Sequence, residues 1–195
     1  RLASAIAAHG VTVVSGLARG IDAVAHAAAL EAGGRTIAVL GSGVDVIYPG
    51  EHRQLASTIA AGGAIVSELP MGAPPDAENF PSRNRLISGL SRGIVVVEAA
   101  ERSGSLITAH VALDQGRDVF AVPGPVGAAT AGTHRLLREG AKLTECAGDV
   151  LEECCPRALA PSAARSSFRP TPAEQKVLAA IGRETVHVDT VMLRS

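Results

Sequence analysis

Residues 11–30 read VTVVSGLARGIDAVAHAAAL, and this stretch decides the fold. The run VTVVSG (11–16) is rich in β-branched residues and has no polar alternation, which is typical of a strand covered on both faces. A glycine-containing loop follows, and the alanine-rich run that begins at Ile21 reads as a helix. The stretch therefore predicts a strand, a loop and a helix, the repeating unit of an α/β fold.

The same alternation continues to residue 145. Further strands are predicted at 36–43, 64–68, 93–99 and 119–124, with helix-like stretches between them. This order predicts an α/β fold with a doubly wound, mostly parallel sheet and crossover helices. The chain opens in a helix-like stretch, RLASAIAAHG (1–10), which leaves room for a strand and its phosphate-side turn upstream of residue 1.

The composition divides the chain into three parts. Residues 1–150 carry the α/β pattern. Residues 151–171 are rich in Pro, Ala, Ser and Arg without periodicity, which predicts a linker. Residues 172–195 begin with Pro172 after a capping residue, Thr171, which predicts the start of a small helical module that stops too soon to be a domain.

Composition also limits the classes of function. The net charge of −1 shows no excess of basic residues over the whole chain, so a nucleic-acid site must rest on local basic patches. Only 2% of the residues are aromatic, which argues against long rows of stacked bases. The three cysteines, Cys146, Cys154 and Cys155, lack metal-ligand spacing, and they fit a reducing cytoplasm. No apolar stretch approaches the roughly 20 residues that span a bilayer, so no membrane association is expected.

Polar and basic residues gather where the predicted strands end, the edge at which doubly wound sheets bind ligands. The loops SGLARGID (15–22), PSRNR (81–85) and RSGS (102–105) offer backbone N–H groups, hydroxyls and guanidinium groups, which suit an anion. In FPSRNRLISGLSR (80–92), a helix over 84–91 would place Leu86, Ile87 and Leu90 on one face, with Arg83 in the loop before it.

Each of these features also has a structural interpretation. Arg19 could pair with Asp22, and the Ser103–Ser105 turn could be only a helix cap, with Ser105 as the capping residue. Glu68 and Glu98 end strands at the same edge, and we favour a role in holding the arginines over a catalytic pair. His26 and His110 lie in alanine-rich helices, where packing or surface roles are expected rather than catalysis.

The common nucleotide motifs are absent or broken. No G-x-x-x-x-G-K-[ST] sequence occurs, and Gly41-Ser42-Gly43 lacks the third glycine of the dinucleotide fingerprint. We therefore expect no nucleotide cofactor, no metal and no catalytic residues.

Six motifs, in this order and spacing, resemble the DNA-processing protein A (DprA/Smf) family over residues 11–145. They are SGLARGIDAVAH, AVLGSGVDVIYPGEH, IVSELPMGAPP, FPSRNRLISGLS, VVVEAAERSGSLITA and FAVPG…GTHRLLREGA. The resemblance implies a Rossmann-like domain that binds single-stranded DNA as a homodimer and helps to load the RecA recombinase during natural transformation. It also implies that residues 172–195 begin a winged-helix-like domain, incomplete here.

The resemblance implies DNA contacts for nine residues. They are Gly16, Arg19, Arg83, Arg85, Arg102, Ser103, Gly104, Ser105 and Lys142. Two alternatives remain. One is a nucleotide-sensing or purely structural module, and the other is a nucleoside-monophosphate phosphoribohydrolase related to LOG proteins, which use a PGGxGTxxE motif. A long insertion separates Pro123-Gly124 from Gly132-Thr133, and Leu136 stands where that motif has its glutamate, so we expect no enzyme.

Overall fold

The structure is a computed structural model that describes residues 1–159, 171 and 175. Its strands are β1 (Val13–Ser15), β2 (Thr36–Val39), β3 (Ala64–Val66), β4 (Gly93–Val96), β5 (Asp118–Ala121) and β6 (Lys142–Leu143). Its helices are α1 (Leu2–Ala8), α2 (Ile21–Glu31), η1 (Gly50–His52), α3 (Arg53–Gly62), α4 (Asn79–Gly89), α5 (Gly104–Asp114), η2 (Ala128–Thr130), α6 (Ala131–Arg138), α7 (Ala147–Cys154) and α8 (Pro156–Leu159). Every predicted strand is present, and β6 is additional.

The strands form two three-stranded sheets, in the orders β1-β2-β3 and β4-β5-β6. All of the strand pairs are parallel, with Val14 beside Ile37 in the first sheet and Val95 beside Phe120 in the second. The parallel α/β prediction is confirmed. The division into two sheets differs from the single sheet that was expected. Within the described part of the chain, β1 pairs with β2 and β4 pairs with β5, and no ladder joins β1 to β4.

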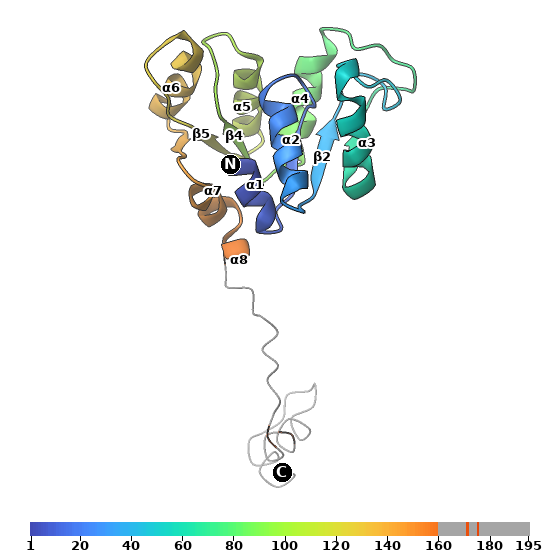
Figure 1. Cartoon of the computed structure of the whole chain (residues 1–195). Coiled ribbons are helices and arrows are strands. Elements are labelled where there is room, and N and C mark those ends of the chain that lie inside the picture. The colour runs from blue at the N-terminus through green and yellow to red at the C-terminus, as the bar shows by residue number, and fades with distance from the viewer. Residues whose placement is uncertain (160–170, 172–174, 176–195) are drawn as a thin grey trace, which may run out of the picture. The chain divides into compact units, whose positions relative to one another are not determined.

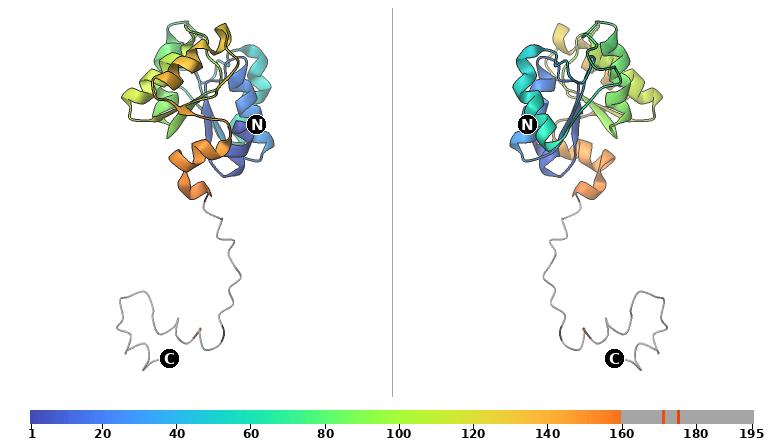
Figure 2. Two further views of the ribbon diagram at one scale, coloured as in Figure 1. Left: turned by 90° about the vertical axis from the view of Figure 1, so that its left-hand side faces the viewer. Right: turned by 90° about the vertical axis from the view of Figure 1, so that its right-hand side faces the viewer.

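Helices cover both faces of the strands. Helices α1, α2 and α3 lie on one side, and α4 and α5 lie on the other (Figures 1 and 2). Consecutive strands are joined through these helices, so the fold is doubly wound and Rossmann-like, as predicted. None of the helices in the described part is long and apolar enough to cross a membrane.

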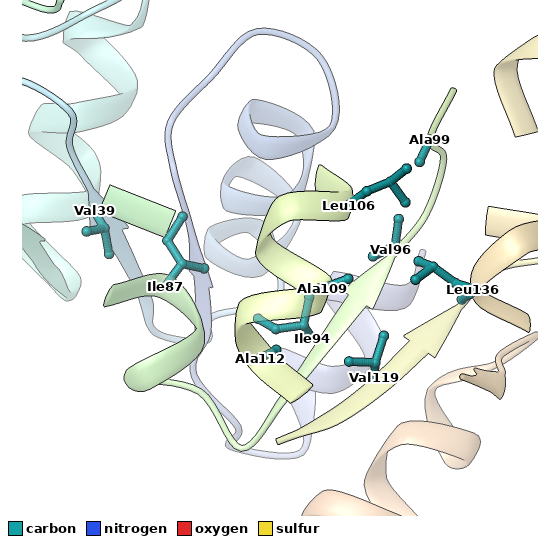
Figure 3. Packing of buried hydrophobic residues seen from close by; sticks show 11 residues of the cluster. Val39, Ile87, Ile94, Val96, Ala99, Leu106, Ala109, Ala112, Val119 and Leu136 are labelled. Carbon is teal, nitrogen blue, oxygen red and sulfur yellow. The ribbon is translucent and has the colours of Figure 1, made fainter. Parts of the chain in front are cut away.

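The core is aliphatic, as the scarcity of aromatic residues requires. Its largest cluster joins β4, α5, β5 and α6 through residues such as Val96, Ala109, Val119 and Leu136 (Figure 3). Phe120 is the one fully buried aromatic side chain in the described region, and it packs with Val150 and Cys154 of α7. Helix α7 therefore belongs to the α/β unit.

The C-terminal boundary of the α/β unit lies later than predicted. Helix α7 runs to Cys154 and α8 occupies Pro156–Leu159, so the first part of the expected linker (151–171) is helical. The compact unit extends over Arg1–Ala160. The helical module expected over 172–195 lies outside the described residues, except for Gln175.

Helix α4 begins earlier than predicted, and this changes the environment of its arginines. The helix starts at Asn79 rather than at residue 84, because Pro81 stands in the first turn, where no helical hydrogen bond is needed from its nitrogen. Arg83 is consequently inside the helix and 7% exposed, not in an open loop. Ile87 is buried as expected, whereas Leu90 lies just past the helix and is 53% exposed.

Candidate functional site

The turn after β1 is held in a fixed and strained conformation. Leu17 is fully buried and has a φ of 58°, a left-handed value that is costly for leucine. The Asp22 carboxylate accepts hydrogen bonds from the N–H groups of Gly16 and Ala18, both at 3.1 Å. His52 Nδ1 contacts the Leu17 carbonyl oxygen at 2.9 Å. Asp22 is therefore engaged by the backbone of this turn.

Arg83 ties the carboxyl ends of β1 and β2 to α4. Its Nη1 donates to the carbonyl oxygen of Gly16 at 3.0 Å and to that of Val39. The guanidinium carbon lies 5.8 Å from the centre of the Phe80 ring, a cation–π contact. Burial lowers the pKa of Arg83. The structure thus gives this residue a structural role, and a phosphate contact by Arg83 stays a prediction.

Gly16 is required by this contact. A Cβ atom at Gly16 would lie 2.5 Å from Nη2 of Arg83, which is closer than any real contact. Any side chain at this position would force the guanidinium group away from the strand ends. Gly16 therefore permits the close approach of Arg83 to β1.

Arg19 and Arg85 are exposed and paired with carboxylates. Arg19 forms a two-pronged ion pair with Glu51, at 2.7 and 2.9 Å, and Arg85 pairs with Glu68. The hydrogen bond from Arg19 lowers the pKa of Glu51, and the same bond raises that of Arg19. The pairing of Arg19 with Asp22 is wrong, whereas the role of Glu68 in holding an arginine is confirmed.

Both of these arginines remain accessible. Their side chains are 63% and 53% exposed, so a phosphate can approach them from solvent. Exposed ion pairs contribute little stability, and a phosphate oxygen can replace a carboxylate oxygen at low cost. Arg19 and Arg85 are therefore accessible to an anion, in contrast to the buried Arg83.

The turn before α5 caps that helix. The Ser103 side chain accepts a hydrogen bond from the N–H of Ser105 at 3.4 Å, and the two hydroxyl oxygens lie 2.7 Å apart. The cap interpretation is confirmed, with Ser103 rather than Ser105 as the capping residue. Gly104 is exposed at the start of this 11-residue helix, where the helix dipole favours an anion. Capping and anion binding are compatible here.

Arg102 and Lys142 lie in different surroundings. Arg102 is exposed beside the Ser103 turn and forms no ion pair with any residue that the structure describes. Lys142 Nζ contacts Asp118 at 2.9 Å and Glu153 at 2.6 Å, and these bonds raise its pKa. Asp118 opens β5, so the Lys142 ammonium group lies toward the amino end of the strands, away from the other predicted residues.

An aromatic pair at this edge was not predicted. The rings of Tyr48 and Phe80 have centroids 5.9 Å apart and are inclined at 46°. Tyr48 is 43% exposed, and Phe80 contacts the Arg83 guanidinium group. The sequence held a signal for the pair, because Tyr48 follows a predicted strand and Phe80 opens the PSRNR segment, both at the ligand edge.

One cavity brings several of these residues together. It has a volume of about 1250 Å³ and lies between β1 and β4. Ala18, Phe80, Arg83, Gly104 and Ser105 contribute to its lining near the carboxyl ends of the strands. Within the described chain, no group of three or more His, Cys, Asp and Glu side chains could hold a metal ion. The guanidinium group of Arg83 and the N-terminus of α5 in the lining suit a polyanion.

Comparison with known proteins finds a matching family and several relatives. The family model of DNA recombination-mediator protein A matches residues 1–155. Protein Smf of Escherichia coli is 50% identical over 200 residues, which cover 97% of this chain and 53% of the relative. DNA processing protein DprA of Streptococcus pneumoniae is 50% identical over 144 residues, 73% of this chain and 51% of that protein. The chain thus spans about half the length of these relatives.

Two solved structures are also similar. The X-ray structure of S. pneumoniae DprA has a TM-score of 0.73 at 46% identity, covering 78% of this chain and 55% of that one. DNA processing protein A from Helicobacter pylori, described for its unique single-stranded DNA binding mode, has a TM-score of 0.71 at 31% identity, covering 77% and 69%. The chain belongs to the DNA recombination-mediator protein A family.

Proposed function

We propose that this protein binds single-stranded DNA at the carboxyl ends of its parallel strands. The observation that carries the proposal is the placement of two exposed guanidinium groups, Arg19 and Arg85, at the same edge as the N-terminus of α5. Guanidinium groups and helix N-termini both suit phosphate oxygens. The Helicobacter pylori relative, described for its single-stranded DNA binding mode, supports the same ligand class.

The proposed phosphate contacts come from two sides of the edge. Arg19 and Arg85 exchange their carboxylate partners for phosphate oxygens, and Arg102 joins them from the loop after β4. Ser103 keeps its capping role, which uses the N–H of Ser105, while Gly104 offers its backbone N–H and Ser105 its hydroxyl group. Gly16 and Arg83 support this edge from beneath, since Arg83 holds the ends of β1 and β2 in place.

Single strands are favoured over duplex DNA. The Tyr48–Phe80 pair gives one or two bases an aromatic surface to stack on, which only unpaired bases can use. Few aromatic residues lie elsewhere, since the chain has one Tyr and three Phe. We therefore expect weak sequence preference and a strong dependence of affinity on salt.

We further propose that the protein acts without catalysis, as a cytoplasmic homodimer that helps to load RecA onto single-stranded DNA. Leu136, at the position of the LOG glutamate, is 1% exposed within the core, so α6 offers no carboxylate there.

The RecA role is tested by measuring the ATPase activity of RecA on single strands with and without this protein, where stimulation is expected. Release of adenine from AMP would instead support the hydrolase.

Binding itself is tested by fluorescence anisotropy with labelled oligo-dT and with a duplex of equal length. The expected result is tighter binding of the single strand, with an affinity that falls as salt rises. A folded sample that binds neither ligand at low salt, or that prefers the duplex, would contradict the proposal.

A further inference from the structure

The turn after β1, residues 16–19, is held by side chains rather than by its own backbone. Among the described residues, no backbone–backbone hydrogen bond outside the helices and strands involves this turn. Instead, the Asp22 carboxylate of α2 accepts hydrogen bonds from the N–H groups of Gly16 and Ala18, both at 3.1 Å. One oxygen atom, Oδ2, accepts both of these bonds, so Asp22 bridges the turn from its N–H side.

His52 of η1 holds the same turn from its carbonyl side. Its Nδ1 lies 2.9 Å from the carbonyl oxygen of Leu17. Because a carbonyl oxygen can only accept, Nδ1 carries the proton and donates it. Two side chains from different elements therefore fix the backbone before and after the same residue.

That residue, Leu17, has the left-handed φ of 58° and a fully buried side chain in the cluster with Leu40 and Ile59. In a continuing strand, Leu17 and Arg19 would project from the same face, because side chains alternate with a period of two. The left-handed backbone at Leu17 breaks this alternation. Leucine is thereby anchored in the core while the Arg19 side chain reaches solvent.

The contacts of η1 with this turn differ in what a ligand does to them. Glu51 forms the ion pair with Arg19, and the next residue, His52, binds the Leu17 carbonyl oxygen. A phosphate that takes the place of Glu51 removes the ion pair but leaves the bond from His52. The bonds from Asp22 and His52 are then the ones that keep Leu17 in its strained conformation.

We infer that Asp22 and His52 are positioning residues for the DNA ligand, which hold the turn after β1 so that Arg19 stays at the ligand edge when it leaves Glu51. Strained backbone persists only where its surroundings over-determine it, and it gathers at ligand sites. A turn fixed in advance also removes an ordering cost from binding. The inference rests on the proposed function, because its readout is the contribution of Arg19 to DNA affinity.

His52 is the more selective probe of the two. Burial lowers the pKa of Arg83, and the nearby Asp22 carboxylate opposes that lowering. Replacing Asp22 therefore disturbs a buried cation as well as the turn. The hydrogen bond of His52 goes to the turn itself, and the residue is only partly buried, so its replacement is compatible with folding.

The variants His52→Asn and His52→Gln form a matched pair for the binding test. Asparagine places its amide nitrogen near the position of Nδ1, whereas glutamine places it one atom farther from the backbone. Oligo-dT is expected to bind His52→Asn within about twofold of the native protein and His52→Gln about three- to tenfold more weakly, the effect of one lost hydrogen bond. The control is His9→Gln, which loses an imidazole–carbonyl contact within α1 and is expected to bind as the native protein does.

The same exchange in an Arg19→Ala background shows whether His52 acts through Arg19. Without the guanidinium group, His52→Gln is expected to change the affinity by less than about twofold. An equal loss in both backgrounds would overturn the inference, because His52 would then support the fold in general. If Arg19→Ala weakens binding and His52→Gln does not, this inference fails alone. If the native protein binds no oligo-dT, it fails together with the proposed function.

Hydrogen exchange, measured by mass spectrometry without DNA, tests the hold on the turn itself. A peptide covering residues 15–20 is expected to exchange at least about tenfold faster at Gly16 and Ala18 in Asp22→Ala than in the native protein. Asp22→Asn keeps an acceptor oxygen and is expected to lie between the two, and peptides covering β5 serve as the control. Unchanged exchange of the turn in both Asp22 variants would overturn the inference.

Discussion

Replacing Arg83 by methionine tests whether this residue holds the site together or binds the ligand. The substitution keeps much of the aliphatic volume but removes the donor to the carbonyl oxygens of Gly16 and Val39. Each carbonyl left unsatisfied costs about 1–3 kcal/mol, and the lost contact with Phe80 adds about 0.5–1 kcal/mol. Relief of the desolvation of the buried cation offsets part of this loss.

The net expectation for Arg83→Met is a loss of about 2–4 kcal/mol in the free energy of unfolding. For a protein of this size, that corresponds to a fall of roughly 6–10 °C in the melting temperature. Arg85→Met is the matched control on the same helix. Its ion pair with Glu68 is about half exposed, so its loss is expected to cost no more than about 1 kcal/mol.

Urea denaturation, followed by circular dichroism, measures both variants against the native protein. Arg83→Lys supplies a further comparison, since an ammonium group keeps the charge but lacks the planar guanidinium group that lies over the Phe80 ring. It is expected to fall between the native protein and Arg83→Met. A structural role for Arg83 is refuted if Arg83→Met unfolds within about 1 kcal/mol of the native protein while its affinity for oligo-dT falls, because Arg83 would then be a ligand contact.

Three further predictions concern the surroundings of the site. Burial lowers the pKa of His26 to about 4 from an ordinary 6.5, so the unfolded chain takes up the proton at a higher pH than the folded protein does. The free energy of unfolding therefore falls by up to about 3 kcal/mol as the pH drops from 6.5 toward 4. In urea titrations, His26→Leu is expected to lose this part of the pH dependence. Ser103→Ala removes the cap of α5 and is expected to lower the free energy of unfolding by about 1 kcal/mol, whereas an unchanged midpoint would show that the cap is not used. Glu51→Gln frees Arg19 from its carboxylate and is expected to raise the affinity for oligo-dT by about two- to fivefold at low salt; weaker binding would mean that Glu51 positions Arg19 for the ligand.

The sequence predicted the strands because each covered strand is a continuous β-branched run. It missed β6, since Lys142 and Leu143 make a strand too short to carry a pattern. It placed the start of α4 too late because Pro81 normally ends a helical pattern, yet proline is tolerated in the first turn. Because the predicted helix began too late, Arg83 was placed in a loop and its burial was not predicted.

Contacts between distant segments were beyond the reach of the sequence pattern. The Tyr48–Phe80 pair joins two loops, and the Arg19–Glu51 ion pair joins the turn after β1 to η1. Such pairings depend on how neighbouring strands set their loops, which periodicity does not encode. The sequence could nevertheless predict that these loops share one edge, because the carboxyl ends of parallel strands lie on one side of the sheet. Ligand binding at this edge stays a prediction.

The most direct test compares the DNA affinity of variants at the carboxyl ends of the strands with that of a variant at the amino ends, in one binding experiment. Oligo-dT affinity is measured across a salt series for the native protein, Arg19→Ala, Arg85→Ala and Lys142→Ala. The carboxyl-edge variants are expected to bind about tenfold more weakly, with the salt slope reduced by about 0.7 for each lost phosphate contact. Lys142→Ala, whose ammonium group lies toward the amino end beside Asp118, is expected to bind as the native protein does. Weakened binding by Lys142→Ala, with Arg19→Ala and Arg85→Ala unchanged, would contradict the account.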